Sequence, residues 1–306
     1  MTTTSQDGAN DLPGLPEPPA EGASALPAGT FAGKLVAVTG GGTGLGKAIA
    51  TEFARLGATV AVLSRDPDHH AAGVAAIEGA GGQATAVRCD VRDPALVAAA
   101  FEELAASVGL PDVLVNNAAG NFPVPAEDLS PNGWRAVVGS VLDGTFHCSR
   151  EFGRRHIAAG TGGSILNIGA SYAWTGGPGF VHSAAAKAGV KNLTETLAVE
   201  WAPYGIRVNG LVPGLFPHED EAAHIAGPDG VPGRRDADEE RRAPALRTGR
   251  RRELGWAATF LASPYAAYIT GHTLVVDGAN WQRRAMLREP FTPIREQLGR
   301  GPFSLE

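Results

Sequence analysis

The chain has 306 residues, a formal net charge of −6 and a hydrophobic fraction of 43%. This length and apolar content suit one large domain or two small ones, and they argue against disorder as the main state. The acidic balance argues against a nucleic-acid partner, and no apolar run approaches the roughly 18 residues of a membrane span. Two cysteines supply neither a disulfide framework nor a four-ligand zinc site, so we expect no metal.

The first 30 residues contain five prolines and no Val, Ile or aromatic residue. A segment of this composition buries too little apolar surface to offset the entropy lost on ordering. We therefore predict a disordered tail over residues 1–30 and one folded domain over residues 31–306. The tail has no Lys or Arg, which excludes a mitochondrial or secretory leader and favours a cytoplasmic protein.

From Lys34 onward, short apolar runs alternate with stretches of helical spacing. The predicted strands cover residues 35–38, 59–63, 84–88, 112–115, 164–168, 206–211 and 273–276. The predicted helices cover residues 45–56, 95–108, 134–157 and 183–201. Strands that are apolar throughout and separated by helices are typical of a parallel sheet covered on both faces. The sequence thus predicts a single α/β domain of the doubly wound, Rossmann type.

One charged stretch, residues 216–252, interrupts this alternation. It holds eight Arg and eight acidic residues, so its charges cancel. Active-site lids are drawn from irregular segments of this kind, and we expect this one to cover a substrate.

A glycine-rich loop follows the first predicted strand and opens the first helix. Glycines there allow a tight turn and let the backbone approach a pyrophosphate, which the helix N-terminus stabilises. A glycine turn without a ligand is the alternative. The predicted cofactor-binding residues of this loop are Gly40, Gly41, Gly42, Thr43, Gly44, Leu45 and Gly46.

The second predicted strand ends at Ser64 and Arg65, which we also assign to cofactor binding. An Arg at this point accommodates the 2′-phosphate of NADP, whereas a carboxylate binds the ribose hydroxyls of NAD. The sequence therefore favours NADP(H). Asp66 keeps NAD open, and Arg65 could equally be a solvated side chain.

Further motifs follow in chain order. They are Cys89-Asp90-Val91, Asn116-Asn117-Ala118-Ala119-Gly120, Lys187, Arg207-Val208-Asn209 and Pro213-Gly214. Together with the glycine loop they resemble the short-chain dehydrogenase/reductase superfamily over about residues 34–279. The resemblance implies a homotetramer.

The same resemblance assigns most of a cofactor site. It implies that Asp90 and Val91 hold the adenine. Asn117 and Ala118 would line the cofactor, and Lys187 would bind the nicotinamide ribose. The residues that would touch the nicotinamide end are Pro213, Gly214, Leu215 and Phe216.

The catalytic positions depart from the usual superfamily pattern. The usual Tyr, four residues before the Lys, is Ser183 here, and the usual Ser, thirteen residues earlier, is Ala170. The 2,4-dienoyl-CoA reductases share this departure. This chain resembles them in Asn116 to Phe122, in Leu129 to Trp134 and in Gly179 to Val190.

This second resemblance implies a different catalytic set. Tyr172, fifteen residues before Lys187, would act in catalysis together with Lys187 and Ser183. Asp143 stands where that family has an active-site Asn. The resemblance places Arg92, Asn121 and Phe122 near an acyl-CoA substrate.

The reaction that the resemblance implies is reduction of a conjugated dienoyl thioester. NADPH would supply a hydride at C5, leaving a dienolate whose charge collects on the thioester oxygen. Tyr172 is the expected hydrogen-bond donor to that oxygen, and the Lys187 ammonium should depress its pKa. Asp143 could donate only if an apolar site kept its carboxyl protonated.

Several assignments have structural alternatives. Tyr172 could be a core aromatic residue, Ser183 could only cap a helix, and Arg92 could be solvated. Trp174 and Phe180 could line an acyl pocket or belong to the core, and His182 is left unassigned. The chain could also be an oxidoreductase for another carbonyl or alcohol, or a non-catalytic sensor that binds NADP(H).

Overall fold

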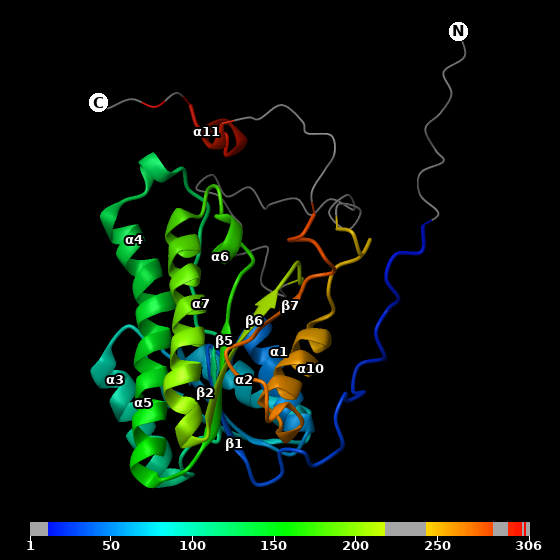
Figure 1. Ribbon diagram of the computed structural model, residues 1–306, viewed down its shortest axis with the longest axis vertical. Helices are drawn as coiled ribbons and strands as arrows, with labels where there is room; N and C mark the ends of the chain where they lie inside the picture. The colour runs from blue at the N-terminus through cyan, green and yellow to red at the C-terminus, as the bar shows by residue number, and fades with distance from the viewer. Residues whose placement is uncertain (1–11, 218–242, 284–292, 302, 304–306) are drawn as a thin grey trace.

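Figure 1 shows the computed structural model of the protein, which describes residues 12–217, 243–283, 293–301 and 303. Its centre is a seven-stranded sheet in the order β3-β2-β1-β4-β5-β6-β7, and all neighbouring strands are parallel. The strands are β1 (Leu35–Thr39), β2 (Thr59–Ser64), β3 (Gln83–Arg88), β4 (Val113–Asn116), β5 (Gly163–Ile168), β6 (Ile206–Pro213) and β7 (Thr273–Val276). The sheet extends in both directions from β1, which confirms the predicted doubly wound fold.

Helices cover both faces of the sheet. The first core lies under α1 (Gly44–Arg55), α2 (Pro67–Gly79) and α10 (Arg251–Ala262). The second core lies under α3 (Pro94–Ser107), α5 (Gly144–Ala159) and α7 (Val181–Trp201). Figure 1 shows α1 and α10 on one side of the sheet and α5 and α7 on the other. Successive strand residues point to opposite faces, so Val36 packs in the first core and Ala37 in the second.

The predicted helix over residues 134–157 is not one uninterrupted α-helix. It consists of α4 (Pro131–Val138), a π-helical turn η2 (Gly139–Asp143) and α5. Gly139 and Gly144 flank the point where the geometry changes, and glycine is a poor former of α-helices. Such π turns inside helices occur frequently at functional sites. Here the turn ends at Asp143, one of the predicted catalytic residues.

Among the described helices of more than two turns, α2 and α10 lie outside the predicted elements. Helix α2 buries only Gly73 and Ile77, so its apolar periodicity is weak. Its start is nevertheless encoded locally, because the Asp66 carboxylate accepts a hydrogen bond from the Asp68 backbone N–H at 2.9 Å. Helix α10 begins inside the charged stretch predicted as a lid. Residues 218–242 of that stretch lie outside the described part of the structure.

Residues 12–30, called the N-terminal segment below, form no helix or strand, but they are not loose. The Leu15 N–H donates to the Ala245 carbonyl at 2.9 Å, and Trp256 Nε1 donates to the Ala23 carbonyl at 3.0 Å. Arg252 Nε donates to the Pro19 carbonyl at 2.7 Å. The prediction of disorder is therefore wrong for these residues. A proline-rich chain keeps all its carbonyl acceptors, and side chains of α10 use them.

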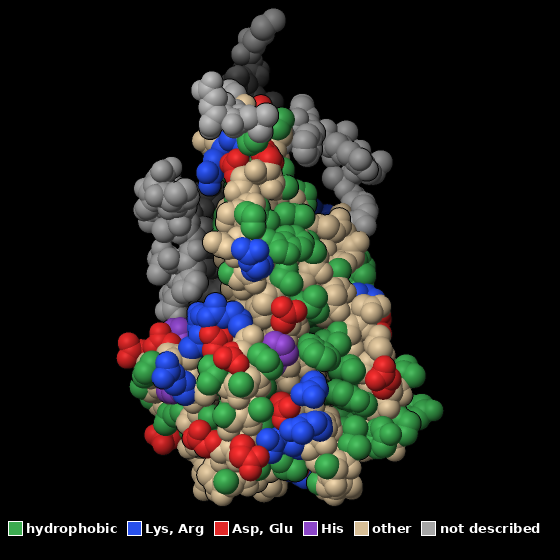
Figure 2. Space-filling view, turned by 90° about the vertical axis from the view of Figure 1, so that its left-hand side faces the viewer, with side chains coloured by type: hydrophobic (Ala, Val, Ile, Leu, Met, Phe, Trp, Pro, Cys, Tyr) green, Lys and Arg blue, Asp and Glu red, His purple; other side chains and the backbone are tan. Residues whose placement is uncertain are grey.

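Charged side chains of both signs are mixed on the face shown in Figure 2. On α5, the buried Glu151 pairs with Arg150 at 3.2 Å and Arg154 at 3.0 Å. Arg155 reaches Glu102 of α3 at 2.9 Å. These pairs cancel charge locally rather than building a field of one sign. Within the described residues, no helix is both long and apolar enough to cross a membrane.

The remaining short helices are α6 (Tyr172–Thr175) and α11 (Ile294–Gln297), together with three 3-10 turns, η1 (Ala126–Asp128), η3 (Ala202–Tyr204) and η4 (Pro264–Ala266). Helix α6 follows β5 closely and packs against α7. It therefore places its residues at the carboxyl end of the sheet, where open α/β folds bind their ligands.

Candidate active site

The glycine loop connects β1 to α1 and is packed so closely that side chains do not fit at several positions. Gly40 and Gly44 have φ values of +64° and +50°, which L-residues rarely adopt. A methyl group on Gly46 would overlap the Asn117 amide and the Gly40 carbonyl. A methyl group on Gly42 would overlap the backbone of His69 in α2. Glycine at these positions therefore allows the loop to pack tightly against Asn117 and α2.

Asn117 and Thr39 hold this loop in place. The Thr39 hydroxyl accepts hydrogen bonds from the backbone N–H groups of Asn117 at 2.9 Å and Ala118 at 3.0 Å. The Asn117 side-chain amide donates to the carbonyls of Thr39 at 3.1 Å and Gly40 at 3.2 Å. The side chain of Asn117, predicted to line the cofactor, thus braces the loop. The role of Thr39 was not predicted, although the residue opens the glycine motif.

Two charged residues at the end of β2, Arg65 and Asp66, are candidate ligands of the cofactor ribose, and their surroundings differ. Ser64 is buried, and its hydroxyl accepts a hydrogen bond from the Asp66 N–H at 3.2 Å. The Asp66 carboxylate caps α2 through the Asp68 N–H, so its local structural role is already explained. Arg65 is exposed beyond the strand end. The cation is therefore the more available of the two charges.

Asp90 and Arg92 form a close ion pair after β3. Arg92 Nε donates to Asp90 Oδ1 at 2.9 Å, and Nη2 donates to Oδ2. The Arg92 hydrogen bonds lower the pKa of Asp90, and the nearby charge of Arg65 lowers it further. Arg92 is thus paired rather than simply solvated. The loop is fixed from α5, because His147 Nδ1 donates to the Val91 carbonyl at 3.0 Å.

Tyr172 is the first residue of α6, and its hydroxyl lies 2.9 Å from the Ser183 hydroxyl. Its ring is stacked on Phe180 with 6.4 Å between centroids and 6° between planes. Burial raises the pKa of Tyr172, and the Ser183 hydrogen bond partly opposes that rise. The expectation that Lys187 depresses this pKa is therefore wrong. Lys187 Nζ donates instead to the Ile168 carbonyl.

Helix α7 carries Ser183 and Lys187 one turn apart. The helix begins at Val181 with Phe180 at the N-cap position, so the interpretation of Ser183 as the N-cap is wrong. Both side chains are buried, and burial lowers the pKa of Lys187 to about 8. The structure therefore brings Tyr172, Ser183 and Lys187 to the same end of α7.

Asp143 is exposed at the end of the π turn, whereas a role as hydrogen-bond donor requires apolar surroundings. The condition under which it could donate a hydrogen bond is thus not met. A methyl group on Gly139 would lie 3.9 Å from Arg92 Cγ and 4.0 Å from Asp143 Oδ2. Arg92 and Asp143 accordingly lie close to Gly139. The sequence did not predict this proximity, because Arg92 and Asp143 are far apart in the chain.

The segment after β6 is fixed to β7 and to the residues that precede α10. The Gly214 N–H donates to the Val276 carbonyl at 2.9 Å, and the Leu215 carbonyl accepts from the Gly249 N–H at 2.9 Å. Pro213 and Leu215 are half-buried, so contact with a cofactor stays open to them. Phe216 is 4% exposed and belongs to the first core, so its ring is used for packing.

Asn121 and Phe122, the other predicted substrate residues, lie exposed in the loop after β4. Asn121 Oδ1 accepts a hydrogen bond from the Phe122 N–H at 3.0 Å. The Phe122 ring packs on His182 with centroids 4.7 Å apart. His182 is fully buried, and neither ring nitrogen has a hydrogen-bond partner among the described residues.

A buried polar network beneath the site was not predicted. Asn116 Nδ2 donates to Ser149 Oγ at 3.0 Å and to Asn167 Oδ1 at 2.8 Å. Asn167 Nδ2 then donates to Thr194 Oγ1 at 2.9 Å. These bonds join β4, β5, α5 and α7, and so fix the helix that carries Lys187. In the sequence, the only indication of this role was the position of Asn116 in the motif that runs from Asn116 to Gly120.

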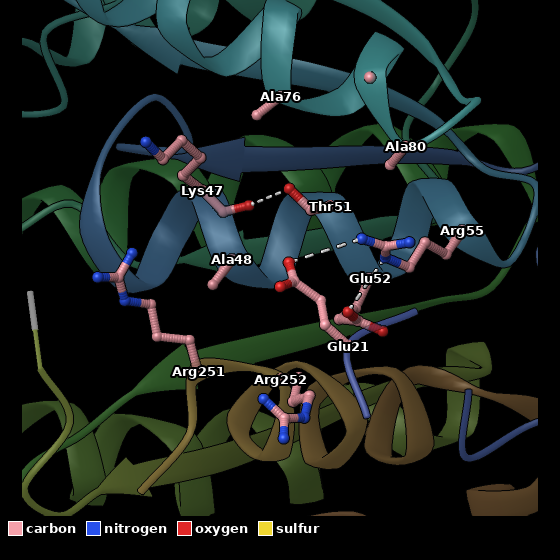
Figure 3. Close-up of a pocket in the computed structure, with 11 residues that line it drawn as sticks. Glu21, Lys47, Ala48, Thr51, Glu52, Arg55, Ala76, Ala80, Arg251 and Arg252 are labelled. Atoms are coloured by element: carbon pink, nitrogen blue, oxygen red, sulfur yellow. Dashed lines mark hydrogen bonds and ion pairs between the residues drawn. The ribbon is translucent and has the colours of Figure 1, made fainter. Parts of the chain in front are cut away.

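Two hollows accompany the site. One, of about 610 Å³, is largely apolar and is lined by Tyr172, Pro178 and Val181 among others. The other, of about 500 Å³, lies on the outer side of α1 against α2 and α10 and is lined by charged residues. Figure 3 shows Lys47 and Arg251 at one end of this second hollow and Arg55 and Glu21 at the other. None of the predicted catalytic residues lines it.

Comparisons with known proteins bear on the family and the fold of the chain. A family model described as enoyl-(acyl carrier protein) reductase matches residues 40–279. A probable 2,4-dienoyl-CoA reductase of Bacillus subtilis is 42% identical over 249 residues, which cover 81% of this chain and 96% of that protein.

Solved structures give the same result. A short-chain dehydrogenase from Bacillus anthracis has 41% identity and a TM-score of 0.72, covering 81% of this chain and 96% of its own. A gluconate 5-dehydrogenase from Burkholderia cenocepacia, solved with NADP and tartrate, has 34% identity and a TM-score of 0.74. That match covers 83% of this chain and 97% of the other.

Proposed function

Since this chain belongs to the short-chain dehydrogenase/reductase superfamily, we propose that it is an NADPH-dependent 2,4-dienoyl-CoA reductase. The product would be a 3-enoyl-CoA, formed when a hydride from NADPH adds at C5 and a proton adds at C2, next to the thioester carbonyl, as in β-oxidation of unsaturated fatty acids. The observation that carries the proposal is the hydrogen bond between Tyr172 and Ser183. Ser183 lies on α7, one helical turn before Lys187. It replaces the Tyr that other members of the superfamily keep on α7.

The residues present fit a dinucleotide. The glycine loop packs without side chains against Asn117 and α2, and it leads directly into the N-terminus of α1, where backbone N–H groups can bind a pyrophosphate. Gly40 to Gly46 would hold the pyrophosphate, Asp90 the adenine and Lys187 the nicotinamide ribose. When bound, NADPH supplies the hydride.

NADPH rather than NADH is the proposed cofactor because of the end of β2. Arg65 is an exposed cation there, and Asp66 is used to cap α2. An Arg at this point suits a 2′-phosphate. The Burkholderia relative named above was solved with NADP, which supports the same choice.

Tyr172 is the proposed donor to the thioester oxygen of the substrate. Burial raises its pKa, so it stays a neutral phenol near pH 7 and keeps a proton to donate. Ser183 orients the phenol through the 2.9 Å contact between their oxygens. A donor already placed where negative charge develops lowers the barrier without reorganisation. The apolar hollow beside Tyr172 suits an acyl chain.

The test mixes the purified protein with NADPH and a 2,4-dienoyl-CoA and follows loss of the cofactor absorbance. We expect turnover, and a loss of about 100-fold or more in kcat for Tyr172→Phe, because an oxyanion donor is removed. Tyr204→Phe, which alters a tyrosine that is 52% exposed, is the matched control.

Three outcomes would redirect the proposal. No consumption above background at several chain lengths would leave an oxidoreductase for another carbonyl, or a sensor that binds NADPH without turnover. Full activity of Tyr172→Phe would remove the role of that residue. Equal use of NADH would remove the role of Arg65.

The proposed homotetramer is checked by light scattering, which should report four chains of 31.5 kDa.

A further inference from the structure

Helix α6 is only four residues long, yet it carries Tyr172. So short a helix has no stability of its own, and its orientation depends on what its side chains contact. On one side, Tyr172 is held by Ser183 and by the stacked Phe180 ring. On the other side, the Trp174 side chain extends from α6 and contacts a segment that is far away in the sequence.

That contact is an aromatic stack between Trp174 and Trp281. The ring centroids are 5.2 Å apart and the planes are inclined by 23°. Trp174 is 36% exposed and Trp281 is half-buried, so neither belongs to a main core. Aromatic pairs in this geometry attract one another beyond their area burial. The stack therefore fixes the outer side of α6.

Trp281 is itself held in an unusual turn after β7. Ala279 has a φ of +67°, a conformation that costs energy for any residue with a side chain. The Asp277 carboxylate accepts a hydrogen bond from the Trp281 N–H at 2.8 Å, which closes the turn. A methyl group on Gly214 would overlap Asp277, so the turn lies directly against the segment after β6.

These contacts form a continuous connection from the proposed nicotinamide end of the site to Tyr172. It runs from Gly214 to Asp277, then to Trp281, and from Trp281 through the stack to Trp174. We propose that Trp281 is a positioning residue, which holds α6 through Trp174 so that Tyr172 meets its substrate. This inference rests on the proposed function, because it takes Tyr172 as the donor.

Substitutions of the two indoles test the proposal. In Trp281→Ala we expect kcat for the dienoyl-CoA to fall on the order of 10- to 100-fold, since small displacements of a catalytic group are costly. The KM for NADPH should change less than about twofold, because the glycine loop is untouched. Trp281→Phe keeps an aromatic face and should restore most of kcat.

A double-mutant cycle separates positioning through Trp174 from any other effect. If Trp281 acts through Trp174, the Trp174→Ala, Trp281→Ala double variant loses no more kcat than the more damaged single variant. Trp134→Ala removes an indole of similar exposure, 39%, from α4 and should leave kcat unchanged. If the kcat losses of the two single variants multiply in the double variant, or if kcat is unchanged in Trp281→Ala, the proposal is overturned.

A second readout needs no turnover. The chain has four tyrosines, so the protein labelled with 3-fluorotyrosine gives four ¹⁹F resonances, and Tyr172→Phe identifies one of them. Trp281→Ala should shift or broaden that resonance alone, whereas Trp281→Phe should not. If Trp281→Ala moves the Tyr172 resonance but the wild-type protein reduces no dienoyl-CoA, the proposed function is wrong and the positioning role of Trp281 stands. A Tyr172 resonance that does not move rejects the positioning, whatever the activity.

Discussion

Asp143 shows how a single residue can match a motif and still lack the expected chemistry. It occupies the position where dienoyl-CoA reductases have Asn, but the structure leaves its side chain exposed. An ionised carboxylate only accepts hydrogen bonds, whereas an Asn amide also donates them. Near a dienolate, the carboxylate would add repulsion.

We therefore expect Asp143→Asn to raise kcat for a dienoyl-CoA by about tenfold, since one hydrogen bond to a charged group is worth about 1.5 kcal/mol or more. Steady-state kinetics at saturating NADPH measure the change. Glu103→Gln, at an exposed acidic residue of α3, is a control for loss of charge alone. A fall in kcat for Asp143→Asn would show that the carboxylate itself takes part.

Lys187 is the residue whose burial has the clearest consequence for pH. Its pKa is lowered to about 8 in the folded protein, against 10.5 for an exposed Lys. Between these values the unfolded chain binds more protons than the folded one, so stability rises with pH. Below about pH 8, the folded state bears the full cost of the buried charge.

Wild type should therefore gain stability relative to Lys187→Met as pH rises from about 8 to 10, by on the order of 2 kcal/mol. Urea unfolding of both proteins across this range measures the difference. Lys191→Met, which removes a partly exposed Lys of the same helix, is the matched control. A difference that stays flat with pH would mean that Lys187 titrates normally.

At the scale of elements, α10 and the N-terminal segment stabilise one another. Glu17 pairs with Arg250 at 2.6 Å, and Arg247 donates to the Pro16 carbonyl at 3.1 Å. Leu26 packs against the first core. The residues that the segment contributes to these contacts precede residue 40, where the match to the family model begins.

Deletion of residues 1–26 should lower the thermal midpoint by roughly 5 °C, because the Trp256 hydrogen bond and the Leu26 packing are lost. Differential scanning calorimetry measures the change. Glu17→Gln should have little effect, since exposed ion pairs contribute little. If the deletion leaves the midpoint unchanged, the observed contacts do not stabilise the fold.

Elements differed in how well periodicity predicted them. The central strands β1, β4 and β5 were predicted nearly in full because both faces of each are buried, which gives continuous apolar runs. Helix α2 was not, because it buries only two residues. The π turn before α5 was not, because the sequence pattern continues through it and only two glycines mark the change.

At the scale of the whole molecule, the sheet order brings distant segments together. Because β4 pairs with β1 and β5, the loops after these three strands meet at one edge. The glycine loop, Asn117 and the segment leading to Tyr172 are on those loops. Parallel strands with right-handed crossovers require this arrangement, so the order of the motifs in the sequence already predicted that they would lie together.

The sequence by itself determined the fold class and the spacing of Tyr172, Ser183 and Lys187, because periodicity and motifs are local properties of the chain. Only the tertiary structure decided which partners these residues have. Lys187 bonds to the Ile168 carbonyl, Ser183 to Tyr172, and the pKa of Tyr172 is raised rather than lowered. Burial and hydrogen-bond partners come from segments that meet only in the folded chain, such as Trp281 against Trp174. Protonation and orientation depend on those surroundings, and no local pattern encodes them.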